Sequence, residues 1–165
     1  PEKYKNETAV IIARHKLVEV KRQKNFASIM QSGGFSPSLF YTDTERFMIK
    51  INDNAALKEF SEISFQKEAS TRGYYSLNKF RTIIGAQVIK PDGTVQEVDV
   101  ANESVSVTEG KNNKESYKKL AIPDLQVGNI LDYFIHKEKD LESENVPPML
   151  FAFYSQYPTL SYSAH

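Results

Sequence analysis

The chain has 165 residues, enough for one ordinary domain, and 40% of them are hydrophobic and 12% aromatic, so a buried core is expected. Lys plus Arg equals Asp plus Glu at 21 each, so the basic excess typical of nucleic-acid-binding proteins is missing, although a local basic patch stays open. The absence of cysteine excludes disulfides, a thiolate nucleophile and cysteine-based metal sites, and no apolar run approaches the ~20 residues of a membrane-spanning helix.

The first expected strand covers residues 8–22 (TAVIIARHKLVEVKR). A continuous apolar run passes there into alternation over residues 17–21, which is typical of one long strand or of two strands joined at a bend. His15 lies in the middle of this segment. Because no partner residue is spaced to help it, we interpret His15 as an ordinary strand histidine and not as a ligand or a catalytic group.

Residues 23–44 are predicted to form a long loop, because their glycine, proline, serine and aspartate residues are typical of turns. The loop also carries many large apolar side chains, so we expect it to fold back onto the sheet, with a helical turn near residues 27–31 as one option. Gly33 and Gly34 lack the Lys-Ser/Thr ending and the strand-to-helix context of a phosphate-binding loop.

The next strand is predicted over residues 45–51, where large apolar residues alternate with polar ones and give the strand one dry face. Residues 52–54 (Asn-Asp-Asn) end it. A short helix over residues 55–60, capped from this Asn-Asp-Asn turn, is one option. We favour instead a turn followed by a strand through residues 60–65, because Phe60, Ile63 and Phe65 have β-forming character.

Two adjacent tyrosines follow the polar segment around Thr71-Arg72-Gly73. Neighbouring residues of a strand point to opposite faces, so one of Tyr74 and Tyr75 is expected in the core and the other in solvent. The exposed ring is a candidate for stacking on a sugar, and the alternative is an ordinary exposed tyrosine.

The clearest hairpin of the sequence lies between residues 81 and 100. Its arms, residues 83–90 and 94–100, flank Pro91-Asp92-Gly93, in which proline supplies the preset φ of a type I turn and glycine the positive φ that follows. The apolar residues of the two arms share one face of the predicted sheet: Ile84, Ala86, Val88, Val98 and Val100.

A second strong strand is expected over residues 130–137 (ILDYFIHK), after a short strand at 103–108, a charged loop and a further strand that starts near 117. It is apolar on both faces, which favours a place inside a sandwich. Asp132 and His136 share one face but lie about 13 Å apart at ~3.3 Å per residue. An Asp-His dyad is therefore not expected.

The last segment, residues 149–157, is rich in aromatic residues. Phe151, Phe153 and Tyr157 are assigned to an inward-facing set and Tyr154 to the solvent side, which makes Tyr154 the third candidate for ligand binding after Tyr74 and Tyr75. The chain starts without methionine and ends close to this aromatic run, so we expect it to be part of a longer protein.

Six segments occur in an order that is similar to one family: ETAVIIARHKLVEV, ERFMIKIN, EFSEISF, GAQVIKPDGTVQEVDV, AIPDLQVGNILDYFIHKE and PPMLFAFYSQYPTLSYS. They resemble an uncharacterised β domain of bacterial exported proteins, found N-terminal to a transglutaminase-like domain of the papain type. The resemblance covers about residues 7–163. The sequence departs from the family in its longer 23–44 connection and in Asp132, where glutamate is more usual, and nothing similar to the cysteine-containing catalytic domain is present.

The resemblance implies a fold, a place and a partner. The fold is a single all-β domain over residues 1–165, a two-sheet, largely antiparallel β-sandwich with long loops. It is expected to be the N-terminal part of a multidomain protein in the periplasm, on the cell surface or secreted from a bacterium. Its expected partner is a transglutaminase-like domain downstream in the same polypeptide.

We expect a non-catalytic accessory domain that holds this neighbour or presents a surface to a glycan, a peptide or a protein, because no nucleophile, base and orienting group are spaced to converge. One alternative is an enzyme that uses carboxylates such as Asp99, Asp124 or Asp132. Another is a structural, adhesin-like unit that pairs through edge strands. The 3 histidines are far apart in sequence and the carboxylates lack calcium-loop spacing, so no metal and no cofactor is expected.

Overall fold

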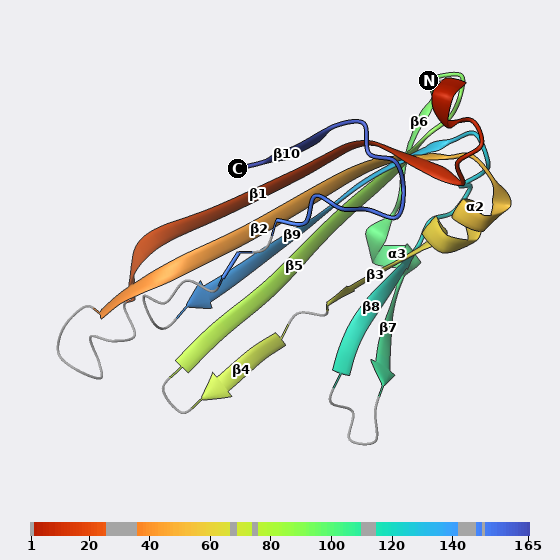
Figure 1. The fold of residues 1–165 in the computed structure, drawn as a ribbon. Helices are drawn as coiled ribbons and strands as arrows, with labels where there is room; N and C mark the ends of the chain where they lie inside the picture. The colour runs from red at the N-terminus through yellow and green to blue at the C-terminus, as the bar shows by residue number, and fades with distance from the viewer. Residues whose placement is uncertain are drawn as a thin grey trace.

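Alternation of apolar and polar residues along the chain builds two β-sheets that pack face to face (Figure 1). The computed structural model describes residues 2–25, 36–66, 69–73, 76–109, 115–141, 148–149 and 151–165. Within these residues, no helix is long and apolar enough to cross a membrane.

The large sheet has the strand order β10-β1-β2-β9-β5-β4, with β6 paired to β5. The small sheet has the order β3-β8-β7. The strands of the large sheet are β1 (Ala9–Asn25), β2 (Ser36–Ile51), β4 (Ala69–Gly73), β5 (Ser76–Ile89), β6 (Val95–Glu97), β9 (Ile130–Leu141) and β10 (Tyr162–Ala164). The small sheet consists of β3 (Glu62–Gln66), β7 (Ser104–Glu109) and β8 (Glu115–Ala121).

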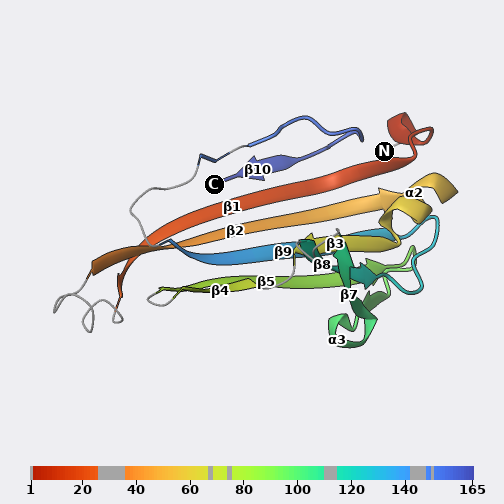
Figure 2. The same cartoon turned by 90° about the horizontal axis from the view of Figure 1, so that it is seen from below.

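The predicted all-β, two-sheet and largely antiparallel fold is confirmed. Of the strand pairs in the described part of the chain, β1 with β10 is parallel and the others are antiparallel. The two sheets differ in length: β1, β2, β9 and β5 continue well beyond the small sheet (Figure 2). The small sheet therefore covers one end of the large sheet, and we call the covered side the inner face and the opposite side the outer face.

The core lies between the inner face and the small sheet. Ile49, Ile51, Val88 and Leu131 of the large sheet are at most 1% exposed, and Leu120 of the small sheet is fully buried beside them. Burial of each such side chain stabilises the fold by about 1.5–3 kcal/mol before conformational entropy is counted. Packing of this end of the molecule thus fixes which face of every long strand points outward.

The predicted hairpin is confirmed in its turn and in its apolar face. The N–H of Lys90 donates to the carbonyl of Thr94 (2.8 Å), the N–H of Gly93 donates to the carbonyl of Lys90 (2.9 Å), and Gly93 has φ 86°. Its second arm is shorter than expected, because β6 ends at Glu97 and Val100 begins the helix α3 (Val100–Glu103). Asp99 causes this change by capping the helix with its side chain, which accepts from two N–H groups.

The strand predicted over residues 130–137 also lies where expected, inside the large sheet. β9 pairs with β2 along one edge and with β5 along the other. Leu131 is fully buried on the inner face, whereas Phe134 on the outer face is 37% exposed. The predicted separation of Asp132 and His136 is also reflected in their contacts, since Asp132 binds Arg46 and Gln87 while His136 contacts Thr44.

The long loop predicted over residues 23–44 is wrong at both of its ends. β1 continues to Asn25 and β2 begins at Ser36, and these residues pair with each other. The sequence hid the strand because Pro37 is untypical of one, but pairing of β2 with β9 starts only at Leu39, so the missing N–H of Pro37 leaves that ladder intact. Residues 26–35, with the helical turn considered near 27–31, lie outside the described residues.

The turn and strand favoured after residue 54 are corrected to the helix α2 (Asn54–Phe60). The carboxylate of Asp53 accepts from the N–H groups of Ala55 (2.9 Å) and Ala56 (3.0 Å), and this cap decides the conformation of a segment with mixed propensity. Ala56 is fully buried against the core. The strand character of the next residues is confirmed, since Ile63 and Phe65 of β3 point into the core.

Candidate ligand-binding surfaces

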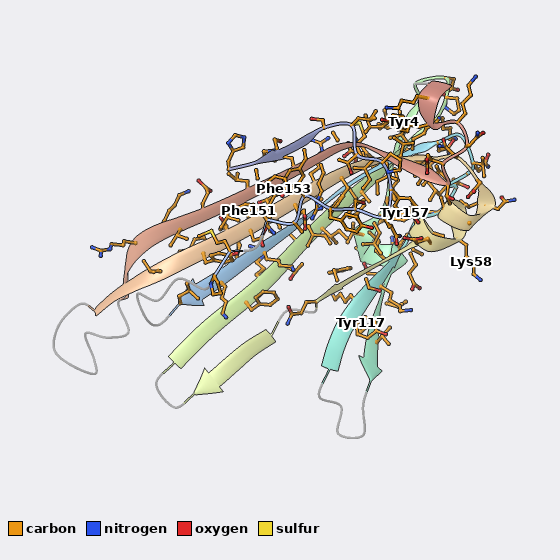
Figure 3. The ribbon with its side chains drawn as sticks, in the orientation of Figure 1. Tyr4, Lys58, Tyr117, Phe151, Phe153 and Tyr157 are labelled. Atoms are coloured by element: carbon orange, nitrogen blue, oxygen red, sulfur yellow. The ribbon has the colours of Figure 1, made fainter. Side chains whose placement is uncertain are left out.

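The C-terminal segment, residues 151–165, lies beside β1 and over the part of the inner face that the small sheet leaves uncovered (Figure 3). Backbone hydrogen bonds tie it to β1: the N–H of Ile11 donates to the carbonyl of Pro158 (2.9 Å), and the N–H of Leu160 donates to the carbonyl of Ile11 (2.9 Å). β10 then continues in parallel with β1. The segment is therefore held at a fixed position on the sheet.

Arg14 of β1 anchors this segment through its guanidinium. The group lies 5.1 Å from the ring centroid of Phe47 and 5.2 Å from that of Tyr162, and it donates to the carbonyl of Ala152 (3.1 Å). It also forms an ion pair with Glu45 (2.5 Å). One partly buried cation thus links the sheet to both ends of the segment, and loss of Arg14 would release it.

Two adjacent aromatic side chains of the segment point into solvent. Tyr154 is 88% exposed, which confirms the orientation predicted for it, and Phe153 is 74% exposed, which corrects its predicted inward orientation. Phe153 turns outward because the ring of Tyr162 occupies the sheet side and meets its edge at a centroid distance of 4.9 Å. Tyr74 and Tyr75, the other two tyrosine candidates, lie outside the described residues.

Tyr157, which was predicted to point inward, does so, and Phe151 of the same predicted set is half-buried. The ring of Tyr157 packs against the core and lies 5.6 Å from the ring of Phe60, and its hydroxyl donates to Glu59 of α2. Partial burial together with the Glu59 carboxylate raises the pKa of Tyr157 to about 12. The aromatic surface, which we define as Phe153 and Tyr154, is thus presented by a backbone fixed at Arg14 on one side and at Tyr157 on the other.

A second candidate site lies on the outer face, around a carboxylate that is almost completely buried. Asp132 is 3% exposed and accepts from Nε (2.9 Å) and Nη2 (2.6 Å) of Arg46 and from Nε2 of Gln87 (2.9 Å). Burial would raise the pKa of Asp132, but the hydrogen bonds from Arg46 and Gln87 and the charge of Arg46 outweigh it, so its pKa is lowered. Asp132 therefore fixes the guanidinium of Arg46 by a bidentate contact.

Strand register brings these side chains together. Asp132 of β9 lies opposite Gln87 of β5, and Gln87 lies opposite Glu97 of β6. In the next row Phe134 lies opposite Gly85, and a Cβ on that glycine would be only 2.5 Å from the Phe134 ring. The ring therefore lies directly over the bare backbone of Gly85.

The outer-face cavity lies between these rows and has a volume of about 340 Å³. It is lined by Arg46, Gly85, Ala86, Gln87, Glu97, Val98, Asp132, Tyr133 and Phe134. Glu97 is exposed, and in the described part of the chain its carboxylate has no hydrogen-bond or ion-pair partner. Of these lining residues, Asp132 was named as a candidate site residue from the sequence. The other residues become its neighbours only through the register of β2, β9, β5 and β6.

The three carboxylates considered for acid-base chemistry have separate local partners. Asp99 caps α3, Asp124 accepts from Nε2 of Gln96 (2.8 Å), and Asp132 is held by Arg46. His15 contacts the hydroxyl of Ser163 (2.8 Å) and His136 that of Thr44 (2.6 Å), so both strand histidines are satisfied by cross-strand partners. Within the described ranges, no group of three His, Asp or Glu side chains is arranged to hold a metal ion.

Comparisons with known proteins identify one family and one structurally similar protein. The family described as "Domain of Unknown Function with solved-structure structure (DUF3857)" matches residues 41–163. A crystal structure from Parabacteroides distasonis, described as a putative protease, is similar at 10% identity with a TM-score of 0.52, and the match covers 80% of this chain and 23% of that one. No curated protein matches the sequence. At 10% identity, the similarity to the Parabacteroides distasonis structure shows a shared fold and nothing about function.

Proposed function

We propose, from the premise that the chain belongs to the DUF3857 family, that it is a non-catalytic accessory domain which works by contact within a larger protein. Its partner in this proposal is a transglutaminase-like or protease-like domain downstream in the same polypeptide. Two findings support this role: the chain spans 23% of the length of a relative described as a putative protease, and it has no cysteine. We also propose that the protein is located in the periplasm, on the cell surface or outside a bacterial cell. This localisation rests on the family resemblance alone.

The observation that carries the proposal is the aromatic surface of Phe153 and Tyr154. Two neighbouring rings that are 74% and 88% exposed lie on a segment whose backbone is held against β1. Aromatic side chains add large contact area with little loss of rotamer freedom, and such residues form the centres of many protein interfaces. Burial of such an aromatic surface against a neighbouring domain is more favourable than its exposure to water.

A structural role through an open sheet edge is the second candidate. β10 is a terminal strand of the large sheet and pairs with β1 on one side. An added strand from another subunit would extend the sheet there by main-chain hydrogen bonds. The two candidates differ in their chemistry, since edge pairing depends on the backbone of β10 and not on the rings of Phe153 and Tyr154.

The test begins with the coding sequence immediately after His165. The polypeptide that it encodes is produced separately, and its binding to the 165-residue chain is measured by calorimetry. We expect binding that the double variant Phe153→Ala/Tyr154→Ala weakens at least tenfold, as for hot-spot residues. Val105→Ala, a change at a 58% exposed apolar residue of β7, serves as the matched control and leaves the affinity unchanged.

Three results would contradict the proposal. The first is the lack of any domain downstream of His165. The second is equal binding by the wild-type chain and a folded double variant. The third is turnover of a peptide, a transglutaminase substrate or a glycoside by the 165-residue chain alone.

A further inference from the structure

We propose that the outer-face cavity binds one neutral sugar ring of a glycan. The inference deepens the proposed contact role and rests on it, but it concerns the face of the sheet opposite to the aromatic surface. The side chains that carry it are Arg46, Gln87, Glu97, Asp132 and Phe134, which line a cavity of about 340 Å³. This volume lies near the lower end for ligand pockets and fits a single ring better than an extended chain.

Arg46 provides fixed donors. Its Nε and Nη2 are bound to the carboxylate of Asp132, which is 3% exposed, while the arginine side chain is 54% exposed. Among the described residues, both N–H groups of Nη1 and the second N–H of Nη2 have no further partner, so they can donate to a ligand. Because Asp132 holds the guanidinium in place, a ligand that binds these donors does not have to order a free arginine side chain.

Gln87 and Glu97 provide the acceptors. The Nε2 of Gln87 donates one hydrogen bond to Asp132, which leaves the side-chain carbonyl of Gln87 as an acceptor for a ligand beside its second N–H. The carboxylate of Glu97 adds two acceptor oxygens beside it in the strand register. A hydroxyl group both donates and accepts, so neighbouring sugar hydroxyls match a guanidinium on one side and these acceptors on the other.

The charge of the site argues against an anionic ligand. The positive charge of Arg46 is balanced by Asp132, and Glu97 then adds one negative charge without a partner in the described chain. A carboxylate or phosphate that binds Arg46 would meet this second carboxylate at close range. A neutral polyhydroxylated ring gains the same hydrogen bonds without that repulsion.

Phe134 supplies an apolar wall. Its ring lies over Gly85 and is held there because the glycine has no side chain, and 37% of the residue is exposed. The C–H face of a pyranose ring is apolar and fits such an aromatic surface, while its edge carries the hydroxyls. Donors, acceptors and an aromatic wall thus meet in one cavity, which is the combination that a sugar ring requires.

The experiment is an NMR titration of the ¹⁵N-labelled 165-residue chain. The probes are the methyl β-glycosides of glucose, galactose and N-acetylglucosamine, with glucuronate as the anionic comparison. At least one neutral glycoside is expected to give saturable shifts centred on the amides of residues 85–87, 97 and 132–134. Glucuronate is expected to bind more weakly than the best neutral probe.

Variants locate the site. Glu97→Ala removes an exposed acceptor and is expected to weaken glycoside binding about tenfold, as for the loss of a hydrogen bond to a charged group. Phe134→Leu keeps an apolar residue but removes the aromatic wall, and a loss of about fivefold is expected. Glu19→Ala and Val105→Ala, matched changes at an exposed acidic residue and at a 58% exposed apolar residue outside the cavity, are expected to bind the glycoside as the wild-type chain does.

The outcomes separate this site from the proposed function. No saturable shift with any neutral glycoside, wild-type affinity in folded Glu97→Ala and Phe134→Leu variants, or tighter binding of glucuronate would each overturn the sugar site. Hydrolysis of a bound glycoside would leave the site standing and overturn the non-catalytic role. Loss of partner binding in Phe153→Ala/Tyr154→Ala with unchanged glycoside binding would support both, because the two surfaces lie on opposite faces.

Discussion

Replacement of Arg46 by methionine probes the ion pair on the outer face directly. The change keeps much of the aliphatic stem but removes both hydrogen bonds that Arg46 donates to Asp132. Asp132 is 3% exposed, so its carboxylate would be left with Gln87 as its remaining hydrogen-bond partner among the described residues. Breaking a buried pair costs about 3–5 kcal/mol, but the arginine side chain is 54% exposed, so we expect a loss of about 2 kcal/mol in the free energy of unfolding.

The loss should depend on pH, with a sign that follows from the pKa of Asp132. In the wild-type chain this pKa is lowered, so its stabilising contribution is present above the ordinary value of 3.8 and is lost as the pH falls through the lowered pKa. Without Arg46, burial is no longer outweighed and the pKa of Asp132 rises. The deficit of Arg46→Met is therefore largest at neutral pH and shrinks on acidification.

Urea denaturation at pH 7 and near pH 3.5 measures this deficit. Arg81→Met is the matched control, because Arg81 lies on the same face, is 60% exposed and forms a 3.8 Å ion pair with Glu138. We expect a change below about 0.5 kcal/mol for this control. A deficit for Arg46→Met that equals that of the control, or that is the same at both pH values, would refute the reasoning.

Further changes test other parts of the structure. Gly85→Ala places a Cβ 2.5 Å from Phe134 and should destabilise the fold by about 1–3 kcal/mol in urea denaturation, and a double variant with Phe134→Ala should recover part of this loss; an unchanged midpoint would show that the ring moves freely. Asp53→Ala removes the cap of α2 and should cost about 1 kcal/mol, whereas Lys58→Ala, an exposed change in the same helix, should cost little. Elemental analysis of tag-free, dialysed protein should find no stoichiometric zinc or calcium, and an equimolar amount of either metal would contradict the expected absence of a metal site.

Local sequence signals predicted the elements that depend on local physics. The Pro91-Asp92-Gly93 turn was recognisable because proline and glycine set the backbone angles themselves. The central place of residues 130–137 followed from their apolar character on both faces. Both inferences need no knowledge of what lies across the sheet.

Elements decided by competing local signals were harder to predict. In α2, the β-forming Phe60 suggested a strand, but the Asp53 cap and the burial of Ala56 select a helix. In the first half of β2, turn-forming residues suggested a loop, but pairing with β1 supplies the hydrogen bonds that make Ser36–Ile51 a strand. Pairing with β1 therefore overrides the local composition of β2, whereas in α2 a local cap outweighs the β propensity of Phe60 with the help of Ala56 burial.

The candidate surfaces were predictable only in part. Tyr154 faces solvent, as predicted. The orientation of Phe153 depends on its contact with the ring of Tyr162, and a local alternation pattern does not indicate such a contact. The outer-face cavity joins Arg46, Gln87, Glu97 and Asp132 from four strands. No sequence spacing marks such a set, because strand register alone makes its members neighbours.

The central claim is that the chain makes contact through Phe153 and Tyr154. The most direct test measures amide hydrogen exchange at residues 152–154, first in the isolated chain and then in the longer polypeptide. No backbone hydrogen bond from these amides is found among the described residues, so rapid exchange is expected in the isolated chain. If the aromatic surface is covered by the neighbouring domain, these amides should exchange at least tenfold more slowly in the longer polypeptide, while those of residues 132–134 keep their rates. Equal exchange rates at residues 152–154 in both proteins would contradict the account.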